Sequence, residues 1–219
     1  SLTVENCTFI NCHGQNRGGA IATYNSGVVN ILNCTFDACT SASAYGGGGA
    51  IGVNGGGPVN VDGCTAINCT TDGNGGGAIT NLGGPLVVSR SWFENCQAGG
   101  NPASGAILNY IADTTIINSF FVGNSSLGSA GGAVSFVGGT NVAHNNTFVD
   151  NTAPAGLAMS LSYTGSWDLS NNLLWDTTES TVSMLYVGTN NGAGAPILID
   201  HFDIKGGQSR LQINSGVVA

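Results

Sequence analysis

Apolar side chains recur at alternate positions in short groups, and these groups return every 26 to 30 residues from one end of the chain to the other. The repeat is clearest at one aligned position, called here the anchor column, which holds Cys7, Cys34, Cys64, Ser91, Ser119, Asn146, Asn172 and Phe202. A period of this length predicts a solenoid, in which each repeat forms one rung of a coil.

Each repeat contains three apolar segments, and an alternation of two is typical of strands with one buried face. Two segments lie just before and just after the anchor, and the third follows the Gly-Ala pairs, as at Ile21, Ile51 and Ile79. The sequence therefore predicts an all-β fold, a single-stranded parallel β-helix of about eight rungs with three short strands per rung. Residues 1–219 would form a single domain.

The position two residues after the anchor predicts a core ladder, because large side chains at one inward position stack from rung to rung. Its members are Phe9, Phe36, Phe93, Phe121, Phe148 and Leu174. The residue before the anchor is often asparagine, which tolerates left-handed dihedrals and predicts a corner there. Glycines at 18, 19, 48, 49, 76, 77, 131 and 132 predict the next corner.

The net charge of the chain limits the kinds of molecule that it can bind. The formal net charge is −8, with only four basic residues among the 219. Nucleic acid is therefore excluded as a partner, since its binding depends on basic side chains. No apolar run approaches the length needed for a transmembrane segment. The 42% of hydrophobic residues and 7% of charged residues also argue against disorder.

Seven cysteines fall in two columns, one at the anchor and one five residues later. Cysteines in the same rung would lie too far apart for a bond, whereas vertical neighbours about 4.8 Å apart permit one. Two states remain open: buried free thiols, or disulfides between neighbours such as Cys12 with Cys39 and Cys69 with Cys96, together with one first-column pair such as Cys7 with Cys34. Metal is not expected, because no histidine shares either column.

The sequence predicts no catalytic residue and no cofactor. Glu5 and Asp62 share an outward column, as do Asp37 and Glu94, and two rung spacings would separate each pair by roughly 9.6 Å, the upper limit for an inverting glycosidase. Basic side chains that would hold an acidic sugar are nearly absent. The three histidines fall in unrelated columns without an evident serine or aspartate partner, which gives a catalytic triad no support.

The strand after the anchor presents apolar side chains outward from the fourth rung onward. Contiguous apolar patches on soluble proteins usually mark an interface, so we expect this strip to be covered. Its members are Trp92, Phe120, Val122, Val149, Leu173 and Trp175. The first and last rungs also lack an evident polar cap, and open rungs recruit further strands.

The repeated unit "NCTF…N…GGAI" resembles the repeats of chlamydial polymorphic outer membrane proteins and related bacterial surface β-helices. The segments "NNLLWDTT" at 171 and "ILIDHFDIKGG" at 197 resemble the end of the right-handed β-helix in secreted choice-of-anchor proteins. Together with rungs longer than those of short hexapeptide-type coils, the resemblance implies a right-handed β-helix. It also implies export, an extracellular or cell-surface location, and an adhesive or structural role. The lack of an initiating methionine and a signal peptide favours a segment of a longer extracellular chain.

The expected function is a non-catalytic scaffold, self-assembling into oligomers or fibres through its end rungs and its apolar strip, or contacting a surface or glycan ligand. One alternative is a lyase or glycoside hydrolase acting on polysaccharides. Another is a glycan-binding module that would hold sugar through Tyr24, Tyr110 or Trp92.

Overall fold

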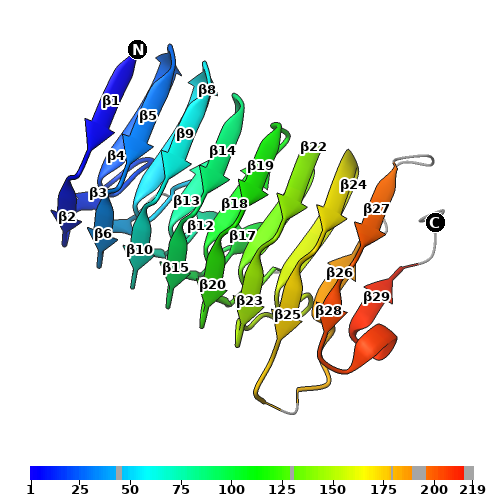
Figure 1. The fold of residues 1–219 in the computed structure, drawn as a ribbon. Coiled ribbons are helices and arrows are strands. Elements are labelled where there is room, and N and C mark those ends of the chain that lie inside the picture. Colours follow the sequence, from blue (N-terminus) through cyan, green and yellow to red (C-terminus); the bar gives the residue numbers. More distant parts are fainter. Residues whose placement is uncertain (43–45, 129–130, 179, 189–195, 215–219) are drawn as a thin grey trace.

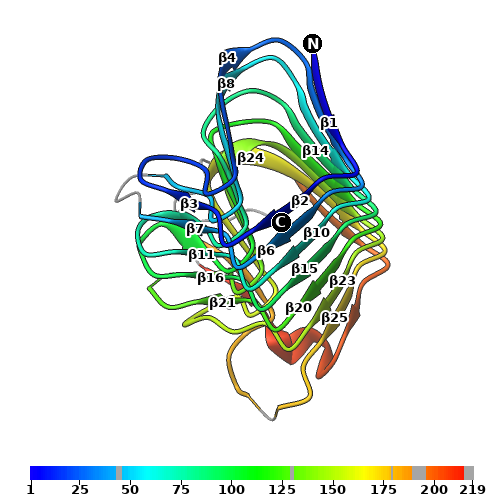
Figure 2. The same ribbon diagram turned by 90° about the vertical axis from the view of Figure 1, so that its left-hand side faces the viewer.

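The computed structural model describes residues 1–42, 46–128, 131–178, 180–188 and 196–214. Over these residues the chain winds into a parallel β-solenoid, which Figure 1 shows as a row of successive rungs running from the N-terminus to the C-terminus. Viewed along the coil, the strands of all rungs superpose around one closed cross-section (Figure 2). The predicted all-β parallel β-helix is confirmed, with about seven complete turns.

Two strand stacks flank the anchor column. The first stack precedes it and consists of β1 (Leu2–Glu5), β5 (Val29–Leu32), β9 (Val59–Asp62), β14 (Leu86–Ser89), β19 (Thr114–Ile117), the later parts of β22 (Val134–His144) and β24 (Met159–Ser170), and β27 (Ile197–Asp200). The second stack follows it and consists of β2 (Thr8–Ile10), β6 (Thr35–Asp37), β10 (Thr65–Ile67), β15 (Trp92–Glu94), β20 (Phe120–Val122), β23 (Thr147–Val149), β25 (Leu173–Trp175) and β28 (Asp203–Ile204).

A third stack, which the sequence pattern did not predict, consists of two-residue strands: β3 (His13–Gly14), β7 (Thr40–Ser41), β11 (Thr70–Thr71), β16 (Gln97–Ala98) and β21 (Ser125–Ser126). The fourth stack is the one expected after the Gly-Ala pairs. It consists of β4 (Ile21–Ser26), β8 (Ile51–Gly56), β13 (Ile79–Asn81), β18 (Ile107–Tyr110), the early parts of β22 and β24, β26 (Leu185–Val187) and β29 (Leu211–Ile213). Two residues cannot show an alternation, which is why the third stack left no signal.

Two smaller elements complete the described coil. The pair β12 (Gly75–Gly76) and β17 (Ala103–Ser104) lies in the loop before the fourth stack, and a 3-10 turn, η1 (Gly207–Arg210), precedes β29. Strands β22 and β24 run without a break from the fourth stack into the first, so these two stacks form one continuous sheet.

The register of the rungs agrees with the sequence columns. Leu2 pairs with Val29, Val29 with Val59, and Val59 with Leu86. On its own strand, each of these residues lies two positions before the next inward residue. The inward residues of the first stack are almost fully buried from the second rung on, as with Ile31, Val61 and Val88. A repeat of like residues therefore places like residues directly above one another.

The asparagines before the anchor occupy left-handed corners, as predicted. Their φ angles are 50–56° at Asn6, Asn33, Asn118, Asn145 and Asn171, and Gly63, Arg90 and His201 complete the same column with φ of 62°, 49° and 50°. A second left-handed corner, not expected from the sequence, precedes the second cysteine column. It is formed by Asn11, Ala38, Asn68, Asn95, Gly123 and Asp150.

At the corner before the fourth stack, most of the glycines are needed because space is short and not because the backbone is left-handed. Of the eight predicted there, Gly131 alone has a left-handed φ, 86°. The others serve close packing of the backbone between rungs, because a Cβ on Gly49 would lie 2.0 Å from the carbonyl oxygen of Gly77, and one on Gly77 2.1 Å from that of Gly105. No side chain fits at that separation, so glycine is required by space.

Candidate functional site

The aromatic core ladder is stacked ring on ring. The Phe9 and Phe36 centroids lie 5.0 Å apart with 4° between the planes, and Phe93, Phe121 and Phe148 follow with centroid distances of 5.0 and 4.8 Å. Ala66 separates the two groups, because it pairs with Phe36 on one side and Phe93 on the other. Leu174 continues the column beyond Phe148 and is fully buried. These side chains fill the interior and are not available to a ligand.

The anchor column forms a ladder of hydrogen bonds along the coil. At each corner the backbone N–H of one rung donates to the side-chain acceptor of the next rung. The sequence of bonds is Cys34 to Cys64 Sγ, 3.4 Å; Cys64 to Ser91 Oγ, 3.1 Å; Ser91 to Ser119 Oγ, 3.2 Å; Ser119 to Asn146 Oδ1, 3.0 Å; and Asn146 to Asn172 Oδ1, 3.0 Å. Sulfur, hydroxyl and amide thus satisfy the same buried backbone donor, which would otherwise be unpaired.

Beyond Cys96, the second cysteine column continues with the same kind of hydrogen bond from a backbone N–H to a side chain of the next rung. Cys96 N–H donates to Asn124 Oδ1 over 2.9 Å, and Asn124 N–H donates to Asn151 Oδ1 over 3.0 Å. The Asn124 amide also donates to the Phe93 carbonyl over 3.0 Å. In the rung before, the thiol of Cys96 donates to the Ala66 carbonyl over 3.5 Å, so thiol and amide hold equivalent positions.

All seven cysteines are free thiols, and the pKa values of Cys39, Cys64 and Cys69 are raised above the ordinary thiol value. Burial raises the pKa of Cys64 to about 11, and a hydrogen bond with Cys69, together with burial, raises the pKa of Cys39 further. The thiolate is the form that attacks substrates and binds metals. The cysteines that the sequence offered for vertical disulfides are therefore found as hydrogen-bonding corner residues.

The paired acids lie as the sequence analysis placed them, two rungs apart in one column. Leu32 stands between Glu5 and Asp62 in the column, and Ile67 stands between Asp37 and Glu94. Asp62 and Glu94 also have separate partners. Asp62 accepts from Arg90 Nε over 2.9 Å and from Ser89 over 2.7 Å, and Glu94 accepts from Trp92 Nε1 over 2.9 Å.

One expectation about the histidines is wrong. His144 and His201 do have aspartate partners, with 2.9 Å from His144 Nε2 to Asp168 Oδ1 and 2.8 Å from His201 Nδ1 to Asp200 Oδ2. The first pair joins adjacent rungs, a proximity that separation along the sequence conceals. The Ser170 hydroxyl bonds to the Asp168 carboxylate and not to the imidazole, so the group lacks the order of a triad. Within the described ranges no cluster of three metal-ligating side chains occurs.

The outer strip expected from the sequence lies on β15, β20, β23 and β25, along the lower row of arrows in Figure 1. Trp92, Phe120 and Trp175 are 37%, 44% and 41% exposed, and Val122, Val149 and Leu173 lie half-buried beside them. Trp92 and Phe120 stack with centroids 5.3 Å apart. Thr147 interrupts one of the two columns, between Phe120 and Leu173.

Polar groups border this strip at both ends. The Trp92 indole donates to Glu94 at one end, and at the other the ammonium of Lys205 lies 5.6 Å from the centre of the Trp175 ring. The Glu94 end of the strip is therefore acidic, and the other end carries the Lys205 ammonium together with Asp203, which pairs with Leu173 in the next rung.

The three aromatic residues considered for sugar binding lie in different places. Trp92 belongs to the strip on the second stack. Tyr24 and Tyr110 share one outward column of the fourth stack, but Tyr24 borders a hollow near Leu2, whereas Tyr110 borders two adjoining hollows further along. Around Tyr110 the structure adds residues that periodicity did not indicate, among them Pro102 and Tyr163. The feature of the sequence that could have pointed to this region is the outward column that contains Tyr24, Leu82 and Tyr110.

The fold defines this chain as a parallel β-helix. Comparison with protein-family models, with curated proteins and with solved structures finds no match. Within the described part of the chain, no helix has the length and apolarity to cross a membrane. Function must therefore be argued from the surfaces of the coil.

Proposed function

We propose that this chain is a non-catalytic structural scaffold of a secreted or surface-displayed protein, and that it pairs laterally with a second copy through the outer strip. The observation that carries the proposal is the strip itself, in which three large aromatic side chains are more than a third exposed on one flat strand stack. Contiguous apolar surface of this kind is usual at interfaces and unusual on free surfaces. The resemblance of the repeat to bacterial surface β-helices supports the location.

The two charged ends favour a second copy as the occupant. In a two-fold arrangement the same patch meets itself in reverse, so the Glu94 end of one copy meets the Lys205 end of the other. The apolar centre, from Trp92 to Trp175, would then be buried between two rows of like side chains. Opposite charges at the borders would set the register of the pair and add little affinity.

The rigidity of the coil supports a scaffold role. Each rung is joined to the next by strand pairing in at least two stacks and by the corner hydrogen bonds. Such a coil holds its outer side chains in fixed rows. A row of this kind suits repeated lateral contact better than chemistry that needs convergent groups.

Sedimentation of the purified chain over a range of concentrations tests the proposal. We expect a dimer, and we expect Trp92→Ser combined with Phe120→Ser to shift it to monomer. Ile10→Ser is the matched control, because Ile10 is 59% exposed on the same stack but lies outside the strip. A wild-type chain that stays monomeric at its highest soluble concentration contradicts the proposal.

Charge reversal tests the orientation of the pair. Glu94→Lys alone and Lys205→Glu alone should each weaken the dimer, and the two together should restore it. Failure of the double variant to recover, with circular dichroism showing an intact fold, would refute the two-fold arrangement.

A further inference from the structure

Two hollows adjoin on the outer side of the fourth stack, where the loops before it fold against its strands. The first has a volume of about 240 Å³ and is bordered by Arg17, Asn74, Leu82 and Leu108. The second has about 340 Å³ and is bordered by Asn101, Ser162, Tyr163 and Tyr186. Pro102 and Tyr110 border both, so the two hollows are direct neighbours, and together they are called here the axial groove.

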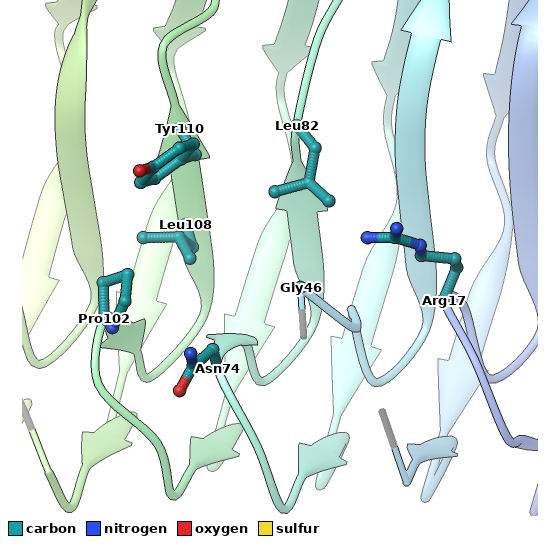
Figure 3. A pocket seen from close by; sticks show the side chains of 7 residues that line it. All are labelled: Arg17, Gly46, Asn74, Leu82, Pro102, Leu108 and Tyr110. Atoms are coloured by element: carbon teal, nitrogen blue, oxygen red, sulfur yellow. The ribbon is translucent and has the colours of Figure 1, made fainter. Parts of the chain in front are cut away.

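The axial groove is long and follows the coil. Arg17 belongs to the first rung and Tyr186 to the seventh, which gives six rung spacings and a length of roughly 29 Å at about 4.8 Å per rung. Figure 3 shows the first hollow: Leu82, Leu108 and Tyr110 come from the strand side, and Gly46, Asn74 and Pro102 come from the loop side. A depression of this shape suits an extended chain better than a compact ligand.

The walls offer rings and neutral hydrogen-bonding groups. Tyr110 and Tyr163 supply two aromatic side chains that are 36% and 51% exposed. The residues that border the groove also include the amides of Asn74 and Asn101 and the hydroxyl of Ser162. Arg17, at the far end, is the one formally charged residue among the described residues that border the groove.

We propose that the axial groove binds a linear, uncharged oligosaccharide, with the Tyr110 ring as its central platform. A sugar has an apolar C–H face that packs on an aromatic ring and a rim of hydroxyl groups that need neutral donors and acceptors, and the groove supplies both. The formal net charge of −8 disfavours an acidic polymer. An extended peptide that binds by strand addition would require an open strand edge, whereas the groove lies on the face of a sheet whose strands are paired on both sides.

This site lies on a different stack from the outer strip, so it stands or falls independently of lateral pairing. Calorimetric titration with cellohexaose, maltohexaose, mannohexaose and xylohexaose provides the test, with hexagalacturonate as the acidic comparison. We expect at least one neutral hexasaccharide to bind, and Tyr110→Ala to weaken it by about tenfold through loss of the stacking surface. Tyr110→Phe should retain most of the binding, because the ring remains.

Tyr24→Ala is the matched control, since Tyr24 occupies the same outward column and is 53% exposed but borders another hollow. It should leave the affinity unchanged. The proposal is overturned if none of the neutral hexasaccharides binds, if only hexagalacturonate binds, or if Tyr24→Ala weakens binding as much as Tyr110→Ala. Both tyrosines are exposed, so neither variant removes buried core.

Discussion

The backbone N–H of Cys64 donates to the hydroxyl oxygen of Ser91, one rung further along the coil, over 3.1 Å. Cys64 in turn accepts, through its sulfur, the N–H of Cys34 over 3.4 Å. The thiol and the hydroxyl therefore do the same work at consecutive corners, and asparagine takes it over from Asn146 onward. The cysteines at this column are explained by hydrogen bonding, without redox chemistry.

Replacement of Cys64 by serine or by valine tests that explanation. The thiol also donates to the Ile31 carbonyl over 3.3 Å, so valine removes a buried donor and a buried acceptor while keeping the volume. We expect Cys64→Val to lower the free energy of unfolding by about 2 kcal/mol and Cys64→Ser to stay within about 1 kcal/mol of wild type. Urea unfolding under reducing conditions measures both. A valine variant as stable as the serine variant would show that packing alone matters there.

Gly105 should not tolerate a side chain. A Cβ at this position would lie 1.8 Å from the carbonyl oxygen of Gly132 in the next rung. Because neither backbone can move without separating the rungs, we expect Gly105→Ala to lower the free energy of unfolding by more than about 3 kcal/mol. Gly27→Ala is the control, since the nearest atom to a Cβ there is 4.0 Å away. Equal thermal midpoints for the two variants would contradict the close-approach argument.

The backbone at Ile111 has a left-handed conformation that asparagine would adopt with less strain. Its φ is 58°, and its side chain is 66% exposed, so no buried contact compensates for the left-handed strain of a β-branched residue. Ile111→Asn should raise the free energy of unfolding by about 1 kcal/mol. Ile111→Val, which keeps the branch, should bring no gain. The expectation fails if the asparagine variant unfolds at a lower denaturant concentration than wild type.

Asp176 links the last described turn of the coil to the one before it. Its carboxylate is 3% exposed and lies 3.2 Å from Arg210 Nη2, and Arg210 Nε also donates to the Val182 carbonyl over 2.9 Å. Burial raises the pKa of Asp176, but hydrogen bonds from Thr178 and Arg210 outweigh it and hold the pKa below its usual range. The carboxyl therefore contributes stability above the unfolded pKa of about 3.9, and this contribution is lost as pH falls through the lower folded value.

Asp176→Asn should lower the free energy of unfolding by about 3 kcal/mol at neutral pH, because it leaves the Arg210 guanidinium nearly buried without its carboxylate. The difference from wild type should shrink as the pH falls from about 4 toward the lower folded pKa, because over that range the unfolded carboxyl binds a proton that the folded carboxyl still resists. Denaturant titrations at pH 7 and at a series of acidic values measure the difference. A gap that widens on acidification would contradict the sign of the linkage.

The sequence determined the coil, its register and its inward residues, because a strand alternation repeated at a nearly constant period leaves only one way to superpose like side chains. Stacked Phe93 and Phe121, the left-handed corner at Asn118 and the outward position of Trp92 all follow from that rule.

Tertiary structure alone decided the features that depend on the path of the loops. The loop carrying Pro102 reaches the strand carrying Tyr110, and Arg210 reaches Asp176, by routes that no period describes. The second left-handed corner includes Ala38 and Asp150. Because the residue type at this corner varies, the sequence column does not indicate a turn. Local pattern specifies what repeats in a solenoid, whereas its irregular contacts depend on distances between segments that become neighbours only when the coil closes.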